Sequence, residues 1–201
     1  MSNDPVDDGR SRCGWADFSG ERWATVDSVL YRNYHDTEWG QPLLGGRELF
    51  ERMTLEAFQS GLSWLIILRK RDNFRAAFER FDAAKIARFG DRDVERLMAD
   101  AGIVRNRAKI EATIANARAV ADLDVELSKL LWSFAPGPRP RPATMSEVPA
   151  VTPESTAMAK ELKRRGFKFV GPTTAYALMQ ATGMVDDHVA SCWVPTAARS
   201  V

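Results

Sequence analysis

The chain has 201 residues, of which 45% are hydrophobic and 27% charged, and its formal net charge is +1. This composition is typical of a soluble globular protein with one medium domain or two small lobes. It argues against a membrane protein, because no apolar run is long enough to span a bilayer, and against a protein that merely coats DNA, which would be more basic. Residues 1–12 are polar and acidic, unlike a signal peptide, and with only two cysteines we expect a cytoplasmic protein.

Apolar spacing and turn signals predict an all-α protein without strands. We expect residues 1–11 to be a disordered lead-in and residues 12–201 to be a single helical domain, which two lobes around a central cleft could form. Residues 16–28 are expected to be irregular, and residues 135–142, with four prolines, a surface loop. Helices are expected at residues 47–60, 62–68, 72–81, 82–89, 91 or 93 to 100, 105–123, 125–134, 152–165 and 173 or 174 to 183, with a short last helix near 186–193.

The two cysteines and two histidines of the chain lie near its two ends. His188 and Cys192 are four residues apart, so on a helix their side chains would share one face. With Cys13 and His35 they make a complete tetrahedral Zn²⁺ set, which predicts that the two ends of the chain meet at one metal. Taken singly, each is more often an ordinary buried or surface residue, and the Cys13-to-His35 gap is not a zinc-finger spacing, so spacing alone leaves both interpretations open.

An aromatic cluster and one glutamate are further candidates. Residues 29–40 hold two tyrosines, a tryptophan and a histidine, which could form the edge of the core or a wall on which a planar ligand stacks. Glu56 lies on the helix expected at 47–60. It is either buried and ready to accept hydrogen bonds, or a surface carboxylate like most glutamates.

The segment 160–174 runs from a basic helix end, through a tight turn that contains Gly171, into a new helix. This is the layout of a helix-hairpin-helix, in which backbone N–H groups at the turn grip a phosphate and nearby lysines and arginines supply a local positive patch. The alternative is an ordinary turn between helices with a solvated basic face.

Five motifs in unbroken order between residues 12 and 193 resemble the bacterial 3-methyladenine DNA glycosylase I family: RCGW at 12–15, YHDTEWG at 34–40, GLSW at 61–64, RGFKFVG at 165–171, and DHV through Cys192 at 187–192. That family is all-α, belongs to the helix-hairpin-helix glycosylase superfamily and carries a structural zinc. The resemblance implies a monofunctional enzyme of base excision repair. It would flip 3-methyladenine out of alkylated double-stranded DNA and release the free base without lyase activity.

The resemblance also implies roles for particular residues. The zinc ligands would be Cys13, His35, His188 and Cys192, and the base-recognising and catalytic carboxylate would be Glu56. The pocket aromatics would be Trp15, Tyr31, Tyr34, Trp39 and Trp64. The strand-separating turn would be Gly61 and Leu62, and from the hairpin we expect DNA contacts at Lys168, Gly171 and Thr173.

Two departures from the family pattern stand out. The interval from Cys13 to His35 is longer than usual, and its extra residues within 16–28 could alter the pocket rim or the zinc loop. Asp186 stands where the family usually has Asn. In the wider superfamily an Asp in such a stretch is the catalytic carboxylate, whereas here we expect the N-cap of the last helix.

Two other classes of protein remain as alternatives. One is a zinc-stapled DNA-binding module that senses damage without chemistry, and the other is a zinc-dependent hydrolase with a water on the metal. We expect a monomer.

Overall fold

The computed structural model describes residues 8–17 and 26–198, and these residues form helices and turns but no strand. The all-α fold class predicted from the sequence is therefore confirmed. No helix among the described residues is long and apolar enough to cross a membrane. The elements are α1 (Val26–Thr37), α2 (Gly46–Gln59), α3 (Trp64–Ala77), η2 (Glu79–Phe81), α4 (Ala83–Ile86), α5 (Asp91–Ala99), α6 (Arg107–Ala121), α7 (Leu127–Trp132), η3 (Met145–Glu147), α8 (Pro153–Arg164) and α9 (Pro172–Ala181).

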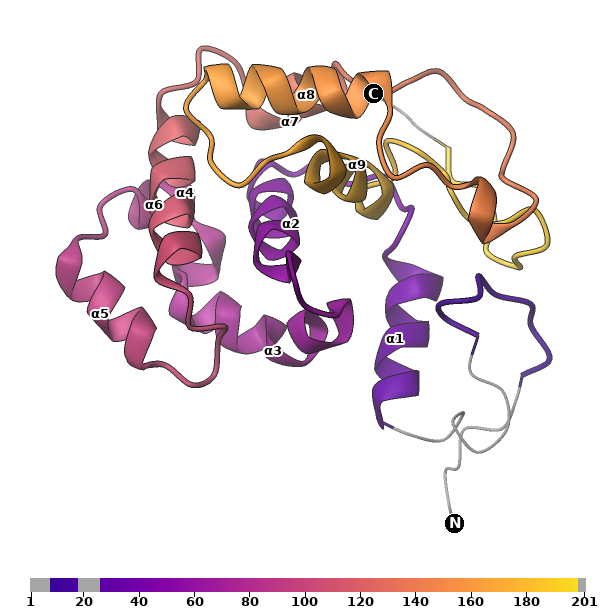
Figure 1. Cartoon of the computed structure of the whole chain (residues 1–201), viewed down its shortest axis with the longest axis horizontal. Coiled ribbons are helices and arrows are strands. Elements are labelled where there is room, and N and C mark those ends of the chain that lie inside the picture. The colour runs from indigo at the N-terminus through magenta and orange to yellow at the C-terminus, as the bar shows by residue number, and fades with distance from the viewer. Residues whose placement is uncertain (1–7, 18–25, 199–201) are drawn as a thin grey trace.

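Helix α2 is the centre of the fold and contacts α3, α6, α7 and α9 (Figure 1). Its residues 52–58 are all buried, so this part of the helix is covered on every side rather than on one stripe. A helix with that pattern has to lie in the interior. Two of the buried residues, Arg52 and Glu56, are ionisable and lie one turn apart. The core of the protein therefore contains a pair of ionisable groups.

Local signals predicted several helices well. Helix α8 begins where expected, because the Thr152 side chain accepts from the Ser155 N–H and Pro153 follows it. The helices expected at 62–68 and 72–81 are one helix, α3, followed by the η2 turn.

Two expectations about helices are wrong. Residues 26–28 were expected to be irregular but begin α1, whose residues to 37 had been described only as an aromatic cluster. Conversely, residues 186–193 form no helix. They fold into a turn in which the Cys192 N–H donates to the Val189 carbonyl at 2.8 Å.

The described ends of the chain lie against one another. The Trp193 N–H donates to the Ser11 carbonyl at 2.9 Å, and the Arg10 guanidinium lies 3.9 Å from the centre of the Trp193 ring. Arg12 bonds both Asp8 and Asp36. Of the expected lead-in, residues 8–11 thus contact the fold, while residues 1–7 lie outside the described part, as do residues 18–25 of the longer interval.

The loop at residues 40–43 lies against the end of α9. The Gly40 N–H donates to the Gln180 carbonyl, and the Leu43 N–H to the Thr182 carbonyl, each at 3.1 Å. Gly183 faces this loop with φ at +72°, and a Cβ there would lie 2.6 Å from the backbone of Gln41 and Pro42. Both the backbone conformation and the space therefore require glycine.

We expect Gly183→Ala to lower the free energy of unfolding by about 2–4 kcal/mol, because it adds left-handed strain to a backbone clash. Gly61→Ala is the matched control: Gly61 has φ at +84°, but nothing lies within 4 Å of its would-be Cβ. Denaturant unfolding of both variants measures the difference. Equal losses would show that the contact with residues 41–42 contributes nothing.

Candidate functional site

One pocket of about 220 Å³ opens beside α1 and α2. The five aromatic residues named from the sequence and Glu56 all line it, although they come from four separate segments of the chain. The lining residues are Trp15, Tyr31, Tyr34, Trp39, Glu56, Gln59, Trp64, Met145, Ala177 and Gln180.

The aromatic walls follow from where the helices begin and end. Tyr31 and Tyr34 lie three residues apart on one face of α1, and Trp64 is the first residue of α3. The Trp15 ring meets Tyr31 edge-on at 5.3 Å and Trp39 at 5.2 Å between ring centres, and Tyr34 lies 5.3 Å from Trp64. Such packing fixes the rings, so the faces that remain open form a rigid apolar slot.

Glu56 carries its carboxyl group into this slot. Only 6% of the residue is exposed, so the surface alternative is wrong. Burial raises its pKa from 4.5 to about 7, against the opposing charge of Arg52. A group poised in this way can be neutral or ionised at neutral pH, according to what enters the pocket.

Arg52 links the slot to a charged network that the sequence did not reveal. Its guanidinium donates to the Tyr34 hydroxyl at 2.8 Å and to Glu38 at 3.1 Å, and Arg71 also donates to Glu38, at 2.6 Å. Arg52 has only donors, so the Tyr34 oxygen accepts and its own proton remains available for another acceptor. The network holds Tyr34 in place and stabilises the charged form of Glu56.

The four cysteine and histidine residues form a buried cluster. Their ligand atoms all lie within 4.8 Å of one another. Sγ of Cys13 lies 3.6 Å from Nδ1 of His188, and Sγ of Cys192 lies 3.5 Å from the same nitrogen and 3.7 Å from Nε2 of His35. The two ends of the chain thus meet at a group of residues that could hold a metal ion. The shared helix face expected for His188 and Cys192 is wrong, because the turn at 189–192 brings them together instead.

Hydrogen bonds outside the cluster orient both imidazoles. Nδ1 of His35 lies 2.7 Å from an Asp36 carboxylate oxygen, and Nε2 of His188 lies 3.1 Å from the Trp39 carbonyl. Because both partners only accept, these nitrogens carry the protons. The other nitrogen of each ring then faces the cluster with a free lone pair, as a metal ligand requires.

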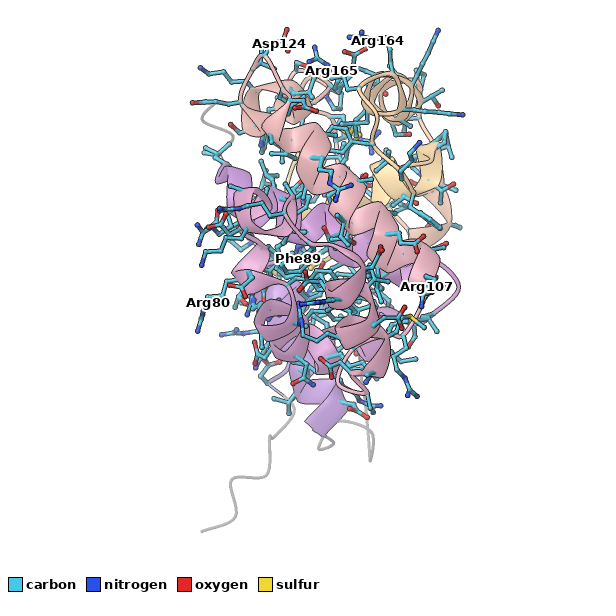
Figure 2. The ribbon with its side chains drawn as sticks, turned by 90° about the vertical axis from the view of Figure 1, so that its left-hand side faces the viewer. Arg80, Phe89, Arg107, Asp124, Arg164 and Arg165 are labelled. Carbon is cyan, nitrogen blue, oxygen red and sulfur yellow. The ribbon has the colours of Figure 1, made fainter. Side chains whose placement is uncertain are left out.

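The residues named for DNA contact lie at two exposed turns. Gly61 and Leu62 join α2 to α3, while Lys168, Gly171 and Thr173 lie between α8 and α9 or at the start of α9. The basic helix end is weaker than its sequence indicates. Arg164 pairs with Glu161, and Arg165 pairs with both Glu161 and Asp124; Figure 2 shows Arg165 near Asp124. The exposed lysines of this region, Lys160, Lys163 and Lys168, therefore supply most of the local charge.

Comparison with known proteins places this geometry in a family. The family model for methyladenine glycosylase matches residues 23–195. The chain belongs to the methyladenine glycosylase family. It is 46% identical to DNA-3-methyladenine glycosylase 1 of Escherichia coli K12, with 90% of this chain and 95% of the relative covered. It is 42% identical to the DNA-3-methyladenine glycosylase of Haemophilus influenzae, with 90% and 96% covered.

Solved structures agree with this family assignment. A crystal structure of 3-methyladenine DNA glycosylase I is similar with a TM-score of 0.83 at 44% identity, covering 91% of this chain and 98% of the other. A variant of such an enzyme in complex with 3-methyladenine is similar with a TM-score of 0.82 at 34% identity, covering 92% and 97%.

Some residues that line the pocket were not predicted from the sequence. Gln59 lies three residues after Glu56 on α2, a spacing that the sequence already offered. Gln180 donates to Asp187 at 2.9 Å, and Asp187 also accepts from Tyr176 and Arg139. The contact between Gln180 and Asp187 joins two residues on either side of a turn, and their separation follows no regular period. No sequence pattern therefore predicted it.

Asp186 does not cap a helix, because none follows it. One carboxylate oxygen accepts from the His188 N–H at 3.3 Å, and the other accepts from Arg141 at 2.9 Å. Asp186 thus stabilises the turn that carries His188, and it is not among the residues that line the pocket. Its catalytic role stays a prediction.

The raised pKa of Glu56 predicts a pH-dependent stability difference. The folded value, about 7, lies above the ordinary 4.5, so this group's contribution to stability is full below pH 4.5 and is lost as the pH rises through about 7. We expect Glu56→Gln to be more stable than the parent at pH 8 by up to roughly 3 kcal/mol, with the advantage vanishing near pH 4. Denaturant unfolding at both pH values measures it. A pH-independent difference would contradict the burial argument.

Proposed function

We propose that this protein is a monofunctional DNA glycosylase that removes 3-methyladenine from alkylated DNA in base excision repair. The observation that carries the proposal is Glu56, a buried carboxylate and the one acidic residue among the described residues that line the pocket, in a slot walled by five aromatic rings. The relatives named above are 3-methyladenine glycosylases, and one of the similar structures holds that base.

A base inside a duplex cannot reach this pocket, so it has to rotate out of the helix at a cost of a few kcal/mol. The Gly61–Leu62 turn lies exposed between α2 and α3, and Leu62 is 37% exposed despite its apolar side chain. We propose that the Leu62 side chain enters the gap that the rotated base leaves in the duplex. Burial of this side chain between the neighbouring bases would offset part of the unstacking cost.

Charge explains the preference for a methylated base. Methylation at N3 leaves the purine positively charged, and each aromatic face attracts such a cation by about 0.5–2 kcal/mol when water is excluded. Glu56 accepts from the exocyclic amine and adds a negative charge. Unmethylated adenine lacks the charge and gains neither contribution in full.

The same charge makes the base a good leaving group, so cleavage needs no strong general acid. Water attacks the sugar carbon and an abasic site remains. No lysine is among the described residues that line the pocket, so none is placed to attack the sugar and cut the strand. This is why we expect no lyase activity.

We also propose that the Cys/His cluster holds a structural Zn²⁺. A tetrahedral ion with Zn–S near 2.3 Å and Zn–N near 2.0–2.1 Å requires S···N separations of roughly 3.6 Å. Three of the four S···N separations in the cluster, at 3.5, 3.6 and 3.7 Å, fit this requirement. Four protein ligands leave no position for water, which speaks against a zinc hydrolase and for a clasp between the two ends of the chain.

We propose further that α8, α9 and the turn between them act as a helix-hairpin-helix. Gly166 at φ +91° and Phe169 at φ +54° make the turn tight, and α9 starts after Gly171 without a side-chain cap. Its first N–H groups can therefore meet a phosphate, with Lys168 beside them. A cytoplasmic location and a monomeric state stay predictions.

The first test is release of free base from methylated duplex DNA. We expect 3-methyladenine in the supernatant, and Glu56→Gln should lower its single-turnover release by roughly 100-fold through loss of the charge that faces the base. Glu48→Gln, the same change at an exposed position of α2, is the control. Binding of methylated DNA without any base release would instead indicate a damage-sensing module.

The second test concerns the metal. We expect about one zinc ion per chain, and Cys192→Ser should lower both the zinc content and the free energy of unfolding, the latter by several kcal/mol. Ser191→Ala, next to it but outside the cluster, should leave both unchanged. A metal-free, fully stable parent protein would refute the zinc clasp.

A further inference from the structure

We infer that two polar side chains of α6, Lys109 and Asn116, position the two exposed turns as one DNA-contacting unit. The inference rests on the proposed function, because it assigns those turns to DNA. It concerns positioning residues only, since neither side chain lines the base pocket.

Lys109 holds the turn after α2. The residue is 7% exposed, and its ammonium group donates to the carbonyls of Phe58 at 2.8 Å and Ser60 at 2.7 Å. These carbonyls lie in the last turn of α2 and at its C-cap, Ser60, where acceptors lack partners within the helix and a cation is favoured. The next two residues are Gly61 and Leu62, so Lys109 fixes the point from which Leu62 projects.

Asn116 holds the turn after α8. It is 2% exposed, its amide nitrogen donates to the Lys168 carbonyl at 3.1 Å, and its amide oxygen accepts from the Lys168 N–H at 2.6 Å. Both backbone groups of one turn residue are thus paired with one side chain. The next residue, Phe169, has a left-handed backbone at φ +54°, and this paired residue anchors it.

The two side chains lie seven residues apart, or two turns of one helix, so they share a face and are separated by roughly 10 Å along it. Figure 2 shows Arg107, at the start of α6, well away from Asp124, just beyond its end, so the helix extends across this side of the molecule. A rigid helix therefore sets the distance between the turn that would enter the duplex and the turn that would hold its phosphates.

Buried polar side chains are a costly way to fill a helix face. An amide or ammonium group loses its water on burial and recovers that cost only through good hydrogen bonds. Here each one bonds backbone groups at or beside an exposed turn, where the chain would otherwise be free to shift. The arrangement therefore fixes the distance between the turn after α2 and the turn after α8.

The test compares DNA with free base. Asn116→Ala should raise KM for base release from methylated duplex DNA by about tenfold or more, because the turns no longer meet the duplex in register. Its affinity for free 3-methyladenine, followed by tryptophan fluorescence, should equal that of the parent protein. Lys109→Met should behave in the same way, and Lys109→Arg, which can still donate to two carbonyls, should restore KM.

Arg118→Ala is the matched control. Arg118 is also on α6 and also donates to two loop carbonyls, those of Ala87 and Phe89, each at 3.0 Å, but that loop precedes α5 (Phe89 is labelled in Figure 2). We expect this variant to lose stability without a change in KM. All variants are compared at a temperature at which circular dichroism shows them folded.

The outcomes distinguish a failure of the positioning role of Lys109 and Asn116 from a failure of the proposed function. An unchanged KM in Asn116→Ala, or a rise in KM that Arg118→Ala reproduces, would overturn the positioning role. A parent protein that neither releases base nor binds 3-methyladenine would instead overturn the proposed function. If Lys109→Met does not fold, Asn116→Ala and Lys109→Arg still decide the question.

Discussion

Glu56 lies inside the protein, one helical turn from Arg52, on the part of α2 that is covered on every side. Burying these groups is expensive, and the structure offsets the cost with a chain of contacts through Tyr34, Glu38 and Arg71. The contacts that keep α2 stable also fix the Tyr34 ring in the slot. Stability and recognition therefore depend on the same few hydrogen bonds.

The Cys/His cluster also positions aromatic rings of this pocket. Trp15 follows Cys13 by two residues and Trp39 follows His35 by four, so closing the cluster brings both rings to the pocket. The Trp39 ring lies 4.7 Å from that of His188, and the Trp15 ring lies 5.0 Å from that of His35. Loosening the ends of the chain would thus open one wall of the pocket, even though the four cluster residues are not among those that line it.

The sequence was most informative where the signal is local. The cap at Thr152 predicted the start of α8, and residue types and motifs named the aromatic rings and Glu56 that line the pocket. It failed at α1, where tyrosines and polar residues hide the helical period, and at 186–193, where a turn satisfies the same spacing as a helix. Arg52 and Gln180 were missed because their partners, Glu38 and Asp187, come from other elements, and such contacts leave no periodic trace.

The raised pKa of Glu56 bears on how selectivity arises. Burial raises the pKa of Glu56 to about 7, so both the acid and its anion are accessible near neutral pH, and a cation that enters the pocket favours the anion. A higher pKa would make deprotonation on binding cost more free energy, whereas a lower pKa would require more compensation for the buried charge. Arg52 contributes to this balance because its charge opposes the effect of burial, although Arg52 is not among the residues that line the pocket. Under the proposed function, α2 and its network account for part of the preference for a charged base, and the aromatic rings add to it by attracting the cation and excluding water.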